Sequence, residues 1–337
     1  MSATLPSLIA LDWGTTALRA YLLDGEGAVL DSRASSAGIM NLPAGGFNEV
    51  FDTTCGAWLA SNPRLPVIAA GMVGSAQGWL EAPYVNTPAD PGALVEGIVS
   101  VKTASGHTVH IVPGVLERGA LPNVMRGEET QIFGALTGDA ALDHEPHGAL
   151  IGLPGTHAKW AFVSKGRIER FYTFMTGETF GALRDHTILG RTMLLTDTHD
   201  RTAFLRGVDT AKDAGHAGML ATIFSTRTLG LTGQLKPEQQ ADYLSGLLIG
   251  HELRGLNEVL ARSQGNPNDT NTLAGKTLRL IGNDTLCERY RSALAQYGCH
   301  DARTVAQATE RGLHRIALQA GLIPSTARAS LIQGTKP

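Results

Sequence analysis

The sequence contains one short pattern twice, half a chain apart. Residues 8–25, LIALDWGTTALRAYLLDG, align without a gap to residues 149–166, ALIGLPGTHAKWAFVSKG, at an offset of 141 residues. Each copy has an apolar run, a Gly-Thr turn and a second apolar run, which is typical of a β-hairpin with a buried first strand. Two such hairpins predict two related domains.

The turn of each copy is suited to binding phosphate. A glycine lets the backbone approach a ligand closely, and successive main-chain N–H groups and threonine hydroxyls donate hydrogen bonds to phosphate oxygens. The candidate residues are Gly14, Thr15 and Thr16 in the first copy and Gly155, Thr156, His157 and Lys159 in the second. Two phosphate loops predict a nucleotide held between two lobes.

The copies differ in acidity just before the loop. Asp12 stands there in the first copy, where a carboxylate can hold Mg²⁺ through waters while the metal bridges nucleotide phosphates. Leu153 occupies the equivalent position in the second copy. The first loop is therefore expected to manage the metal, with Arg19 facing the same site, and Lys159 to meet phosphates or an anionic substrate. A plain turn with a solvated Asp12 is the alternative.

A pair of acids begins a predicted helix shortly before the second copy. The segment MRGEETQIFGAL places Glu128 and Glu129 in the first turn, where acidic side chains suit the positive end of the helix dipole. A carboxylate there can accept a proton from an attacking hydroxyl or water. Adjacent helical residues point about 100° apart, so one acid can face the site and the other solvent. Two surface acids are the alternative.

Two glycine-containing segments are further candidates for substrate contacts. AGMVGS, at residues 70–75, follows a strand and can press its backbone against a small substrate. MTGE, at residues 175–178, follows the third strand of the second copy, where Thr176 or Gly177 is expected to cap a helix. The residues singled out are Gly71, Met72, Ser75, Thr176 and Glu178.

A late strand-to-helix turn, IGND at residues 281–284, is a candidate for the base of the nucleotide. Gly282 would admit a flat adenine ring against the backbone, and Asn283 would read an edge of the base or the ribose. A plain turn with Asp284 as helix N-cap is the alternative.

Composition excludes several other classes of protein. The 337 residues suit about two domains, and the net charge of −3 gives no basic excess for nucleic acid. No apolar stretch approaches the roughly 18 residues that cross a bilayer, and the N-terminus lacks the pattern of a secretion signal. The three cysteines lack any metal-ligand spacing, so buried reduced thiols are expected. We expect a cytoplasmic protein without nucleic-acid or membrane partners.

In the order of these features the chain resembles the superfamily of sugar kinases, hsp70 and actin. Six strings make the resemblance closer: LDWGTT, AGMVGS, NVMRGEETQ, LPGTHAKW, FMTGE and YLSGLLIG. Together they resemble the 2-dehydro-3-deoxygalactonokinase family. The resemblance implies an α/β protein with two ribonuclease H-like lobes, mixed sheets flanked by helices, around a nucleotide cleft, which is the actin-like ATPase fold.

The resemblance also implies an activity and a division of the chain. The activity is phosphoryl transfer from ATP, with Mg²⁺, to the 6-hydroxyl of 2-dehydro-3-deoxy-D-galactonate in galactonate breakdown. Residues 139–147 are polar and form the best linker. We therefore expect an N-terminal sugar-binding lobe at 1–145 and a C-terminal adenosine-binding lobe at 146–337, whose last helix packs back toward the first lobe.

The resemblance assigns roles to the candidate residues. Asp12 matches the metal-organising acid of the superfamily, and RGEET resembles the GxEEA stretch of exopolyphosphatases, whose second glutamate is catalytic. This favours Glu129 as general base, with Glu128 and Asp12 as the other contenders. The substrate's carboxylate needs a cation or amide cluster, for which Arg126, Lys159 or a helix N-terminus are the nearest options. The expected substrate set is Arg19, Gly71, Met72, Ser75, Arg126, Thr176 and Glu178.

Two rival functions fit the same pattern. A phosphatase of this architecture, such as an exopolyphosphatase, would use water in place of the sugar hydroxyl. An actin-like or hsp70-like nucleotide switch would need a large added interface or peptide domain. Galactonate-derived and gluconate-derived sugar acids differ at one stereocentre, which the sequence does not discriminate. The oligomeric state also stays open, with a homodimer as one option.

Overall fold

The structure is a computed structural model that describes residues 5–44, 46–139, 142, 148–212, 218–263 and 272–324. Its chain forms two compact units. Unit 1 comprises Met1–His147, Ala161–Phe171 and Ala306–Pro337, and unit 2 comprises Gly148–Trp160 and Tyr172–Val305. The division expected at 145/146 stays a prediction, and most of the linker expected at 139–147 lies outside the described residues.

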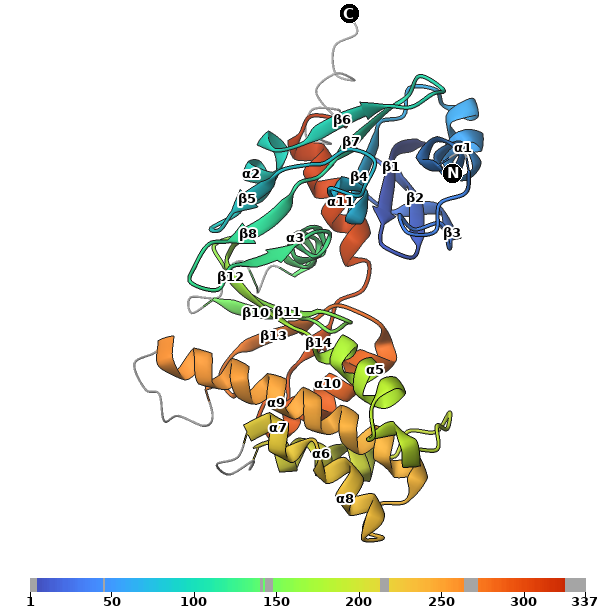
Figure 1. The fold of residues 1–337 in the computed structure, drawn as a ribbon. Helices are drawn as coiled ribbons and strands as arrows, with labels where there is room; N and C mark the ends of the chain where they lie inside the picture. Colours follow the sequence, from blue (N-terminus) through green and yellow to red (C-terminus); the bar gives the residue numbers. More distant parts are fainter. Residues whose placement is uncertain are drawn as a thin grey trace, which may run out of the picture. The chain divides into compact units, whose positions relative to one another are not determined.

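The first sheet has six strands, drawn in Figure 1. They are β1 (Pro6–Trp13), β2 (Leu18–Asp24), β3 (Val29–Ser35), β4 (Val67–Ala70), β6 (Val99–Lys102) and β7 (Thr108–Ile111). Their order is β3-β2-β1-β4-β7-β6. The hairpin expected at residues 8–25 is confirmed, because β1 and β2 pair antiparallel with Asp12 opposite Arg19. Strand β4 runs parallel to β1, and β7 runs parallel to β4.

The second sheet repeats this plan. Its strands are β10 (Ala149–Leu153), β11 (Ala158–Ser164), β12 (Arg167–Phe174), β13 (Thr277–Leu280) and β14 (Arg303–Thr304), in the order β12-β11-β10-β13-β14. Strand β13 runs parallel to β10, and β14 runs parallel to β13. Three consecutive strands side by side, followed by parallel strands, is the ribonuclease H-like order. The predicted fold class, α/β with two such mixed sheets flanked by helices, is confirmed.

Helices and a small sheet complete unit 1. They are α1 (Gly46–Ser61), the 3₁₀ turn η1 (Met72–Gly74), α2 (Pro91–Glu96), α3 (Glu128–Gly138), α11 (Ala308–Gln319), and the strands β5 (Tyr84–Asn86), β8 (Gly114–Glu117) and β9 (Asn123–Met125). Helix α1 buries Phe51, Cys55 and Trp58, spaced along one helical face, against the apolar side chains of the first sheet.

The last described helix packs on the acid-bearing one within unit 1. Helices α3 and α11 lie side by side in Figure 1 and approach so closely that a Cβ at Gly134 would lie 1.8 Å from the Ala308 oxygen. A Cβ at Gly312 would lie 1.9 Å from the Thr130 oxygen. Only glycine permits this backbone contact. The Arg315 Nη1 also donates to the carbonyl oxygen of Phe133 at 3.3 Å.

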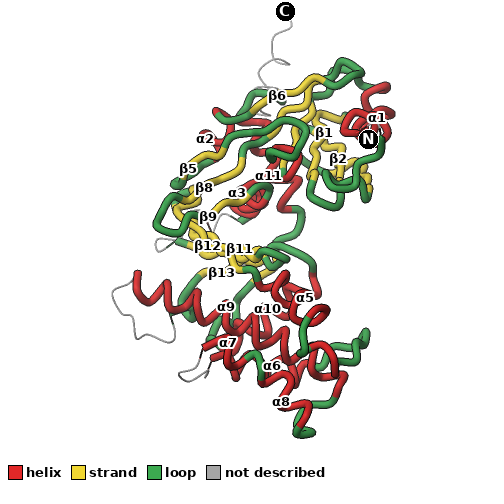
Figure 2. Tube along the Cα trace, in the orientation of Figure 1, coloured by secondary structure: helices red, strands yellow, loops and turns green. Residues whose placement is uncertain are grey.

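Unit 2 is rich in helix, as Figure 2 shows. Its helices are α5 (Thr176–His186), η2 (Gly190–Thr192), α6 (Arg201–Lys212), α7 (Gly218–Thr222), α8 (Ser225–Leu231), η3 (Pro237–Gln239), α9 (Gln240–Ser263) and α10 (Asp284–Gln296). Helix α9 has 24 residues and buries residues on all its sides. This long buried helix supports the cavity wall described below.

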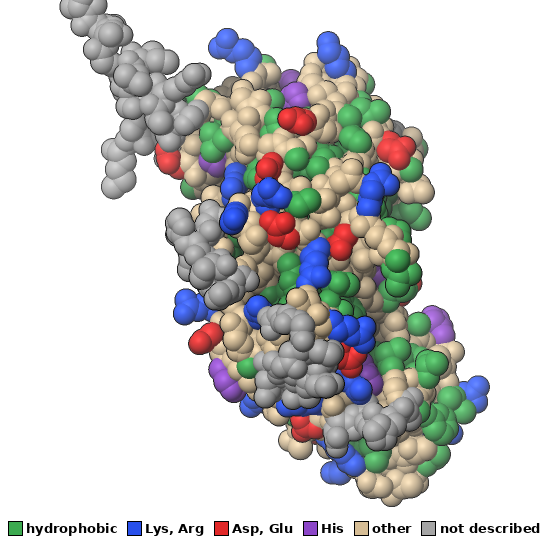
Figure 3. All heavy atoms as spheres, turned by 90° about the vertical axis from the view of Figure 1, so that its left-hand side faces the viewer, with side chains coloured by type: hydrophobic (Ala, Val, Ile, Leu, Met, Phe, Trp, Pro, Cys, Tyr) green, Lys and Arg blue, Asp and Glu red, His purple; other side chains and the backbone are tan. Residues whose placement is uncertain are grey.

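The polarity of the helices, the surface charge and the cysteines can each be described for the residues that the structure covers. Within the described part of the chain, every helix is too short or too polar to span a lipid bilayer. On the face drawn in Figure 3, basic and acidic side chains are interspersed among the described residues. Cys55, Cys287 and Cys299 are buried and free, as predicted.

Candidate active site

In unit 1 three segments meet at the carboxyl ends of β1 and β4. The parallel register sets Asp12 opposite Ala70, so Gly71 follows directly. A Cβ at Gly71 would lie 2.8 Å from the Trp13 oxygen, and one at Gly127 would lie 3.2 Å from the Gly71 Cα. Both glycines have positive φ values, 97° and 108°, which other residues adopt only with strain. The end of β1, the exit of β4 and the start of α3 are therefore held together, where ligands bind in such sheets.

The two glutamates at the start of α3 have different environments. Glu128 is half-buried, and its Oε2 accepts from the Arg126 N–H at 3.0 Å. Glu129 is fully buried, and the Gly127 N–H donates to its two oxygens at 2.9 and 2.7 Å. The Thr130 hydroxyl donates to Glu129 Oε1 at 3.1 Å. The carboxylate of Glu129 thus closes back on the first turn of its own helix.

Burial and neighbouring charge raise the pKa values of two acids in unit 1, Glu129 and Asp12. Burial, and then the charge of Glu128, raise the pKa of Glu129 to about 8, although hydrogen bonds oppose the rise. Burial also raises the pKa of Asp12, opposed by the Arg19 guanidinium at 3.6 Å and reinforced by Glu310 and Glu128. Unit 1 therefore carries an electrostatically coupled acidic group.

Glu310 belongs to this group and was missed in the sequence. It lies in the first turn of α11, where an acid is explained well enough by the helix dipole. Its position about 300 residues after Asp12 gave no sign of proximity. The packing of α11 on α3 and on β1, the strand that carries Asp12, brings its charge to bear on Asp12.

Arg126 is an unusual buried cation. Its side chain lies 4.3 Å over the ring of Tyr84, and its Nη2 donates to the Ala82 oxygen at 2.9 Å. Its Nε and Nη1, and also the buried Ser75 Oγ, have no hydrogen-bond partner among the described residues. Because unpartnered buried donors cost free energy, such groups indicate a place for a missing acceptor. A Cβ at Gly74, next to Ser75, would lie 3.1 Å from Arg126 Nη1, so the groups come from neighbouring segments.

In unit 2 the second loop packs against the start of α5. The Glu178 N–H donates to the Thr156 oxygen at 3.0 Å, and a Cβ at Gly177 would lie 2.5 Å from the Gly155 oxygen. His157 Nε2 pairs with the Glu178 carboxylate. Residues predicted for separate roles, phosphate and substrate, thus form one contact.

Lys159 lies in strand β11, directly after the second loop. Its side chain is buried, and its Nζ donates to the His157 oxygen at 3.0 Å. The ammonium group of Lys159 therefore stabilises the loop, because it binds a backbone oxygen of the loop itself.

Two expectations about helix caps were wrong. Met175, and neither Thr176 nor Gly177, is the N-cap of α5, and no side chain caps this helix. The Thr176 hydroxyl donates to a different acceptor, Glu252, because Thr176 already lies in the first turn. At the start of α10 the cap is Asn283, which accepts from the N–H groups of Thr285 and Leu286. The alternative with Asp284 as cap was therefore also wrong.

A cavity of about 820 Å³ lies in unit 2. Four of the sequence-predicted residues line it: Gly155, Thr156, Thr176 and Asn283. The sequence gave no sign of a second polar cluster in its wall. There Asp242 pairs with Arg289 Nη2 at 2.9 Å and hydrogen-bonds His199 Nδ1 at 2.8 Å, while Arg289 Nη1 donates to Ser245 at 3.2 Å. Asp242 and Ser245 lie on α9, Arg289 lies on α10, and His199 precedes α6, so the cluster follows no short motif.

Comparison with known proteins shows the family of this chain. The family model described as 2-keto-3-deoxy-galactonokinase matches residues 12–316. The chain belongs to this family. It is 34% identical over 312 residues to the 2-dehydro-3-deoxygalactonokinase of Escherichia coli (strain K12), covering 92% of this chain and 97% of that relative. It is 35% identical over 294 residues to the probable 2-dehydro-3-deoxygalactonokinase DgoK1 of Rhizobium meliloti (strain 1021), covering 86% and 89%.

A solved structure supports the galactonokinase assignment at the level of the fold. The crystal structure of a candidate 2-dehydro-3-deoxygalactonokinase from Sinorhizobium meliloti superimposes with a TM-score of 0.78 at 32% identity, covering 92% of this chain and 98% of that one. The family resemblance read from the six sequence strings is therefore confirmed. The roles of individual residues in this galactonokinase-family chain stay predictions.

Proposed function

We propose that the protein is an ATP-dependent 2-dehydro-3-deoxygalactonokinase that phosphorylates the 6-hydroxyl of 2-dehydro-3-deoxy-D-galactonate in cytoplasmic galactonate catabolism. The observation that carries the proposal is the family match from residue 12 to residue 316, with curated relatives aligned over most of the chain. No observation on the described residues favours the phosphatase.

The cavity of unit 2 is the proposed site for the adenosine part of ATP. Its volume of about 820 Å³ falls within the roughly 300–1,000 Å³ of small-molecule sites. Gly155 and Thr156 in its wall would donate to phosphate oxygens, and the Asn283 side chain, whose oxygen caps α10, keeps its amide N–H groups for the base or ribose.

Asp12 is the proposed residue for Mg²⁺. No group of three or more His, Cys, Asp or Glu residues in the described chain could hold a metal ion alone. This fits Mg²⁺, which is usually bound by one or two carboxylates together with substrate phosphates and waters. When bound, the metal would neutralise charge on the phosphates.

Glu129 is the proposed general base, and Glu128 tunes it. A base works best with a pKa near the working pH, and the pKa of Glu129 is raised to about 8 by burial and by Glu128. The substrate hydroxyl would replace the Gly127 N–H at one of the carboxylate oxygens. Catalytic hydrogen bonds often form only in the complex with substrate.

Arg126 is proposed to receive the carboxylate of the sugar acid, with the hydroxyl of Ser75 beside it. The enclosed Nε and Nη1 of Arg126 are unpartnered donors of a guanidinium group, which makes strong charge-assisted hydrogen bonds to carboxylate oxygens. Gly71 and Met72 would form the adjacent backbone surface for the rest of the sugar acid.

The assignment is tested with purified protein, ATP, Mg²⁺ and the sugar acid. ADP should form with the sugar acid and not in its absence, and the product should carry phosphate on the 6-hydroxyl. ADP formation at the same rate without the sugar acid would instead support the phosphatase. The gluconate-derived epimer, assayed in parallel, measures selectivity at the stereocentre.

A further inference from the structure

Glu252 is a buried acid on helix α9. Three side chains donate to its carboxylate: Trp160 Nε1 to Oε1 at 2.6 Å, Tyr290 to Oε2 at 2.8 Å, and the Thr176 hydroxyl also to Oε2. The donors come from β11, α10 and α5, so one carboxylate joins four elements of unit 2. The exposed fraction of Glu252 is 3%.

Two of these donors flank the second phosphate loop. Trp160 lies in the strand that leaves the loop, and Thr176 begins the helix that packs on the loop through Gly177 and Glu178. Thr176 and Tyr290 also line the cavity of about 820 Å³. The carboxylate therefore fixes groups on both sides of the loop and in the cavity wall.

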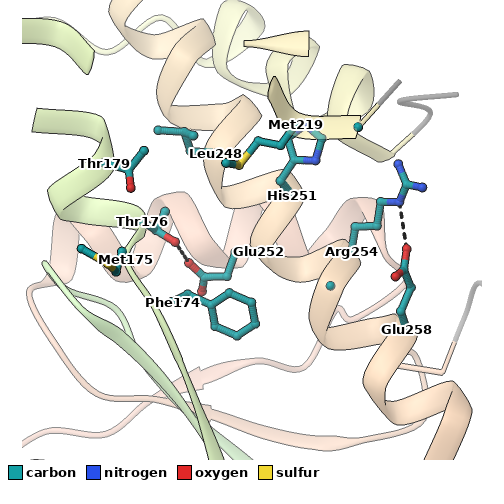
Figure 4. Close-up of a pocket in the computed structure, with 12 residues that line it drawn as sticks. Phe174, Met175, Thr176, Thr179, Met219, Leu248, His251, Glu252, Arg254 and Glu258 are labelled. Carbon is teal, nitrogen blue, oxygen red and sulfur yellow. Dashed lines mark hydrogen bonds and ion pairs between the residues drawn. The ribbon is translucent and has the colours of Figure 1, made fainter. Parts of the chain in front are cut away.

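Figure 4 shows the carboxylate of Glu252 reaching from α9 to Thr176. Glu252 also lines a second cavity of about 460 Å³, together with Phe174, Met175 and His251. The carboxylate is thus part of the lining of one cavity and is hydrogen-bonded to residues that line the other.

The chemistry of the three bonds requires an acceptor at both oxygens. An ionised carboxylate only accepts, whereas a glutamine side chain would turn N–H donors toward one set of the same partners. Burial raises the pKa of Glu252 to about 7, and the three hydrogen bonds oppose the rise. Burying an acid is costly unless it is fully hydrogen-bonded, and every donor here is in place.

We propose that Glu252 is a positioning residue for the nucleotide: it holds Trp160 and Thr176 so that the second loop and the cavity wall keep the geometry that binds ATP. The proposal rests on the proposed function in that the nucleotide is ATP. Glu252 itself does not need to touch the nucleotide, because it acts through Thr176 and Tyr290.

The test is calorimetric titration of the full-length protein with Mg·ATP. Glu252→Gln keeps the size of the side chain and replaces one acceptor oxygen with an N–H donor, so the Kd for ATP should rise about tenfold, the scale of one lost hydrogen bond to a charged group. Thr176→Val should raise the Kd similarly, and Thr176→Ser should restore it. In the double variant the two losses of ATP binding free energy should not add, because each substitution disrupts the same contact between Thr176 and Glu252.

The matched control is Glu258→Gln, the same change on the same helix. Glu258 is exposed and pairs with Arg254 at 3.1 Å, away from the loop partners of Glu252. Its Kd for ATP should equal that of the wild type. In the kinase assay, Glu252→Gln should raise the KM for ATP and leave the KM for the sugar acid unchanged, a split that general destabilisation would not produce.

ATP Kd values within twofold of wild type for both Glu252→Gln and Thr176→Val would overturn the proposal, as would equal losses in Thr176→Val and Thr176→Ser. Thr176→Val decides the matter if Glu252→Gln does not fold. A wild type that binds Mg·ATP but does not phosphorylate the sugar acid contradicts only the proposed function. A wild type that does not bind ATP contradicts both.

Discussion

The two predicted phosphate loops have similar solvent exposure, but they differ in the residue that precedes them and in the neighbouring cavity. In each loop the glycine is half-buried and the next two residues are exposed. The first loop follows the half-buried Asp12, whereas the second follows the buried Leu153 and lies on the wall of a large cavity. The same repeated hairpin therefore follows an acid in unit 1 and lines a cavity in unit 2.

The buried acids of the two units show the same contrast. Glu129 is held by a backbone N–H and the hydroxyl of Thr130, and a second acid, Glu128, stands beside it. Glu252 is held by three side-chain donors from other elements, and no neighbouring charge contributes to its raised pKa. The first arrangement suits proton transfer, because like charge raises the pKa, whereas the second suits the alignment of structural elements.

The largest effect is expected from removing the proposed base. Glu129→Gln should lower kcat by about 100-fold or more, the range of general base catalysis, while the ATP Kd stays near wild type. Turnover and ATP titration measure the two quantities. Near-normal turnover would show that Glu129 is not the base, and the proposed contrast between Glu129 in unit 1 and Glu252 in unit 2 would fail.

Glu128→Gln is the companion change. The base must be deprotonated, so activity should rise with pH through the pKa of Glu129, which is about 8. Removal of the Glu128 charge lowers that pKa, so the rise in kcat should move to lower pH. An unchanged pH profile of kcat would show that Glu128 does not tune the base.

Asp12→Asn should affect the metal requirement next most strongly. If Asp12 holds Mg²⁺ through waters, the Mg²⁺ concentration for half-maximal activity should rise by about 10- to 100-fold, the usual effect of an outer-shell change. Titration of activity with Mg²⁺ at saturating ATP measures it. If the Mg²⁺ concentration for half-maximal activity equals that of the wild type, Asp12 does not hold the metal, and the first loop does not differ from the second in this respect.

A methyl group between loop and helix tests unit 2. In Gly177→Ala the new Cβ would meet the Gly155 oxygen at 2.5 Å, so α5 and the loop must separate and the KM for ATP should rise roughly tenfold, by about 1.4 kcal/mol. Gly181→Ala, on the same helix with nothing within 4 Å, should instead stabilise the protein by up to about 1 kcal/mol. Equal KM values for ATP in the two variants would contradict the close packing.

The pH dependence of stability separates the two buried acids. Glu252 has a folded pKa of about 7, raised from 4.5, so its contribution to the free energy of unfolding is full below pH 4.5 and is lost as pH rises through 7. Relative to Glu252→Gln, the wild type should lose about 1.4 kcal/mol per pH unit within that window. For Glu129 against Glu129→Gln the loss should continue to about pH 8. Urea unfolding across this range measures both, and parallel stability curves would refute the pKa shifts.

Local patterns predicted much of this architecture. The repeated hairpin indicated two similar sheets, and RGEE indicated the start of a helix, which begins at Glu128. These features depend on residues close in sequence, where strand alternation, turns and helix-dipole preferences act directly.

The contacts that complete the sites depend on packing between distant segments. His157 and Glu178 were assigned to different ligands, yet they pair because α5 lies against the loop. Glu252 left one weak signal, an acid inside the apolar string LSGLLIGHEL. Nothing in that string identified Trp160 as its partner, 92 residues away.

The packing of α11 on α3 has a consequence for folding during synthesis. Residues 308–319 leave the ribosome long after Asp12 and Glu129 have emerged, yet α11 supports the helix that carries Glu129 and brings Glu310 near Asp12. A nascent chain can fold its first strands early, but its acidic group has no α11 to pack on until residue 319 has been added. Premature termination between Glu129 and α11 would yield a fragment that contains every proposed catalytic acid and lacks the helix that packs on α3.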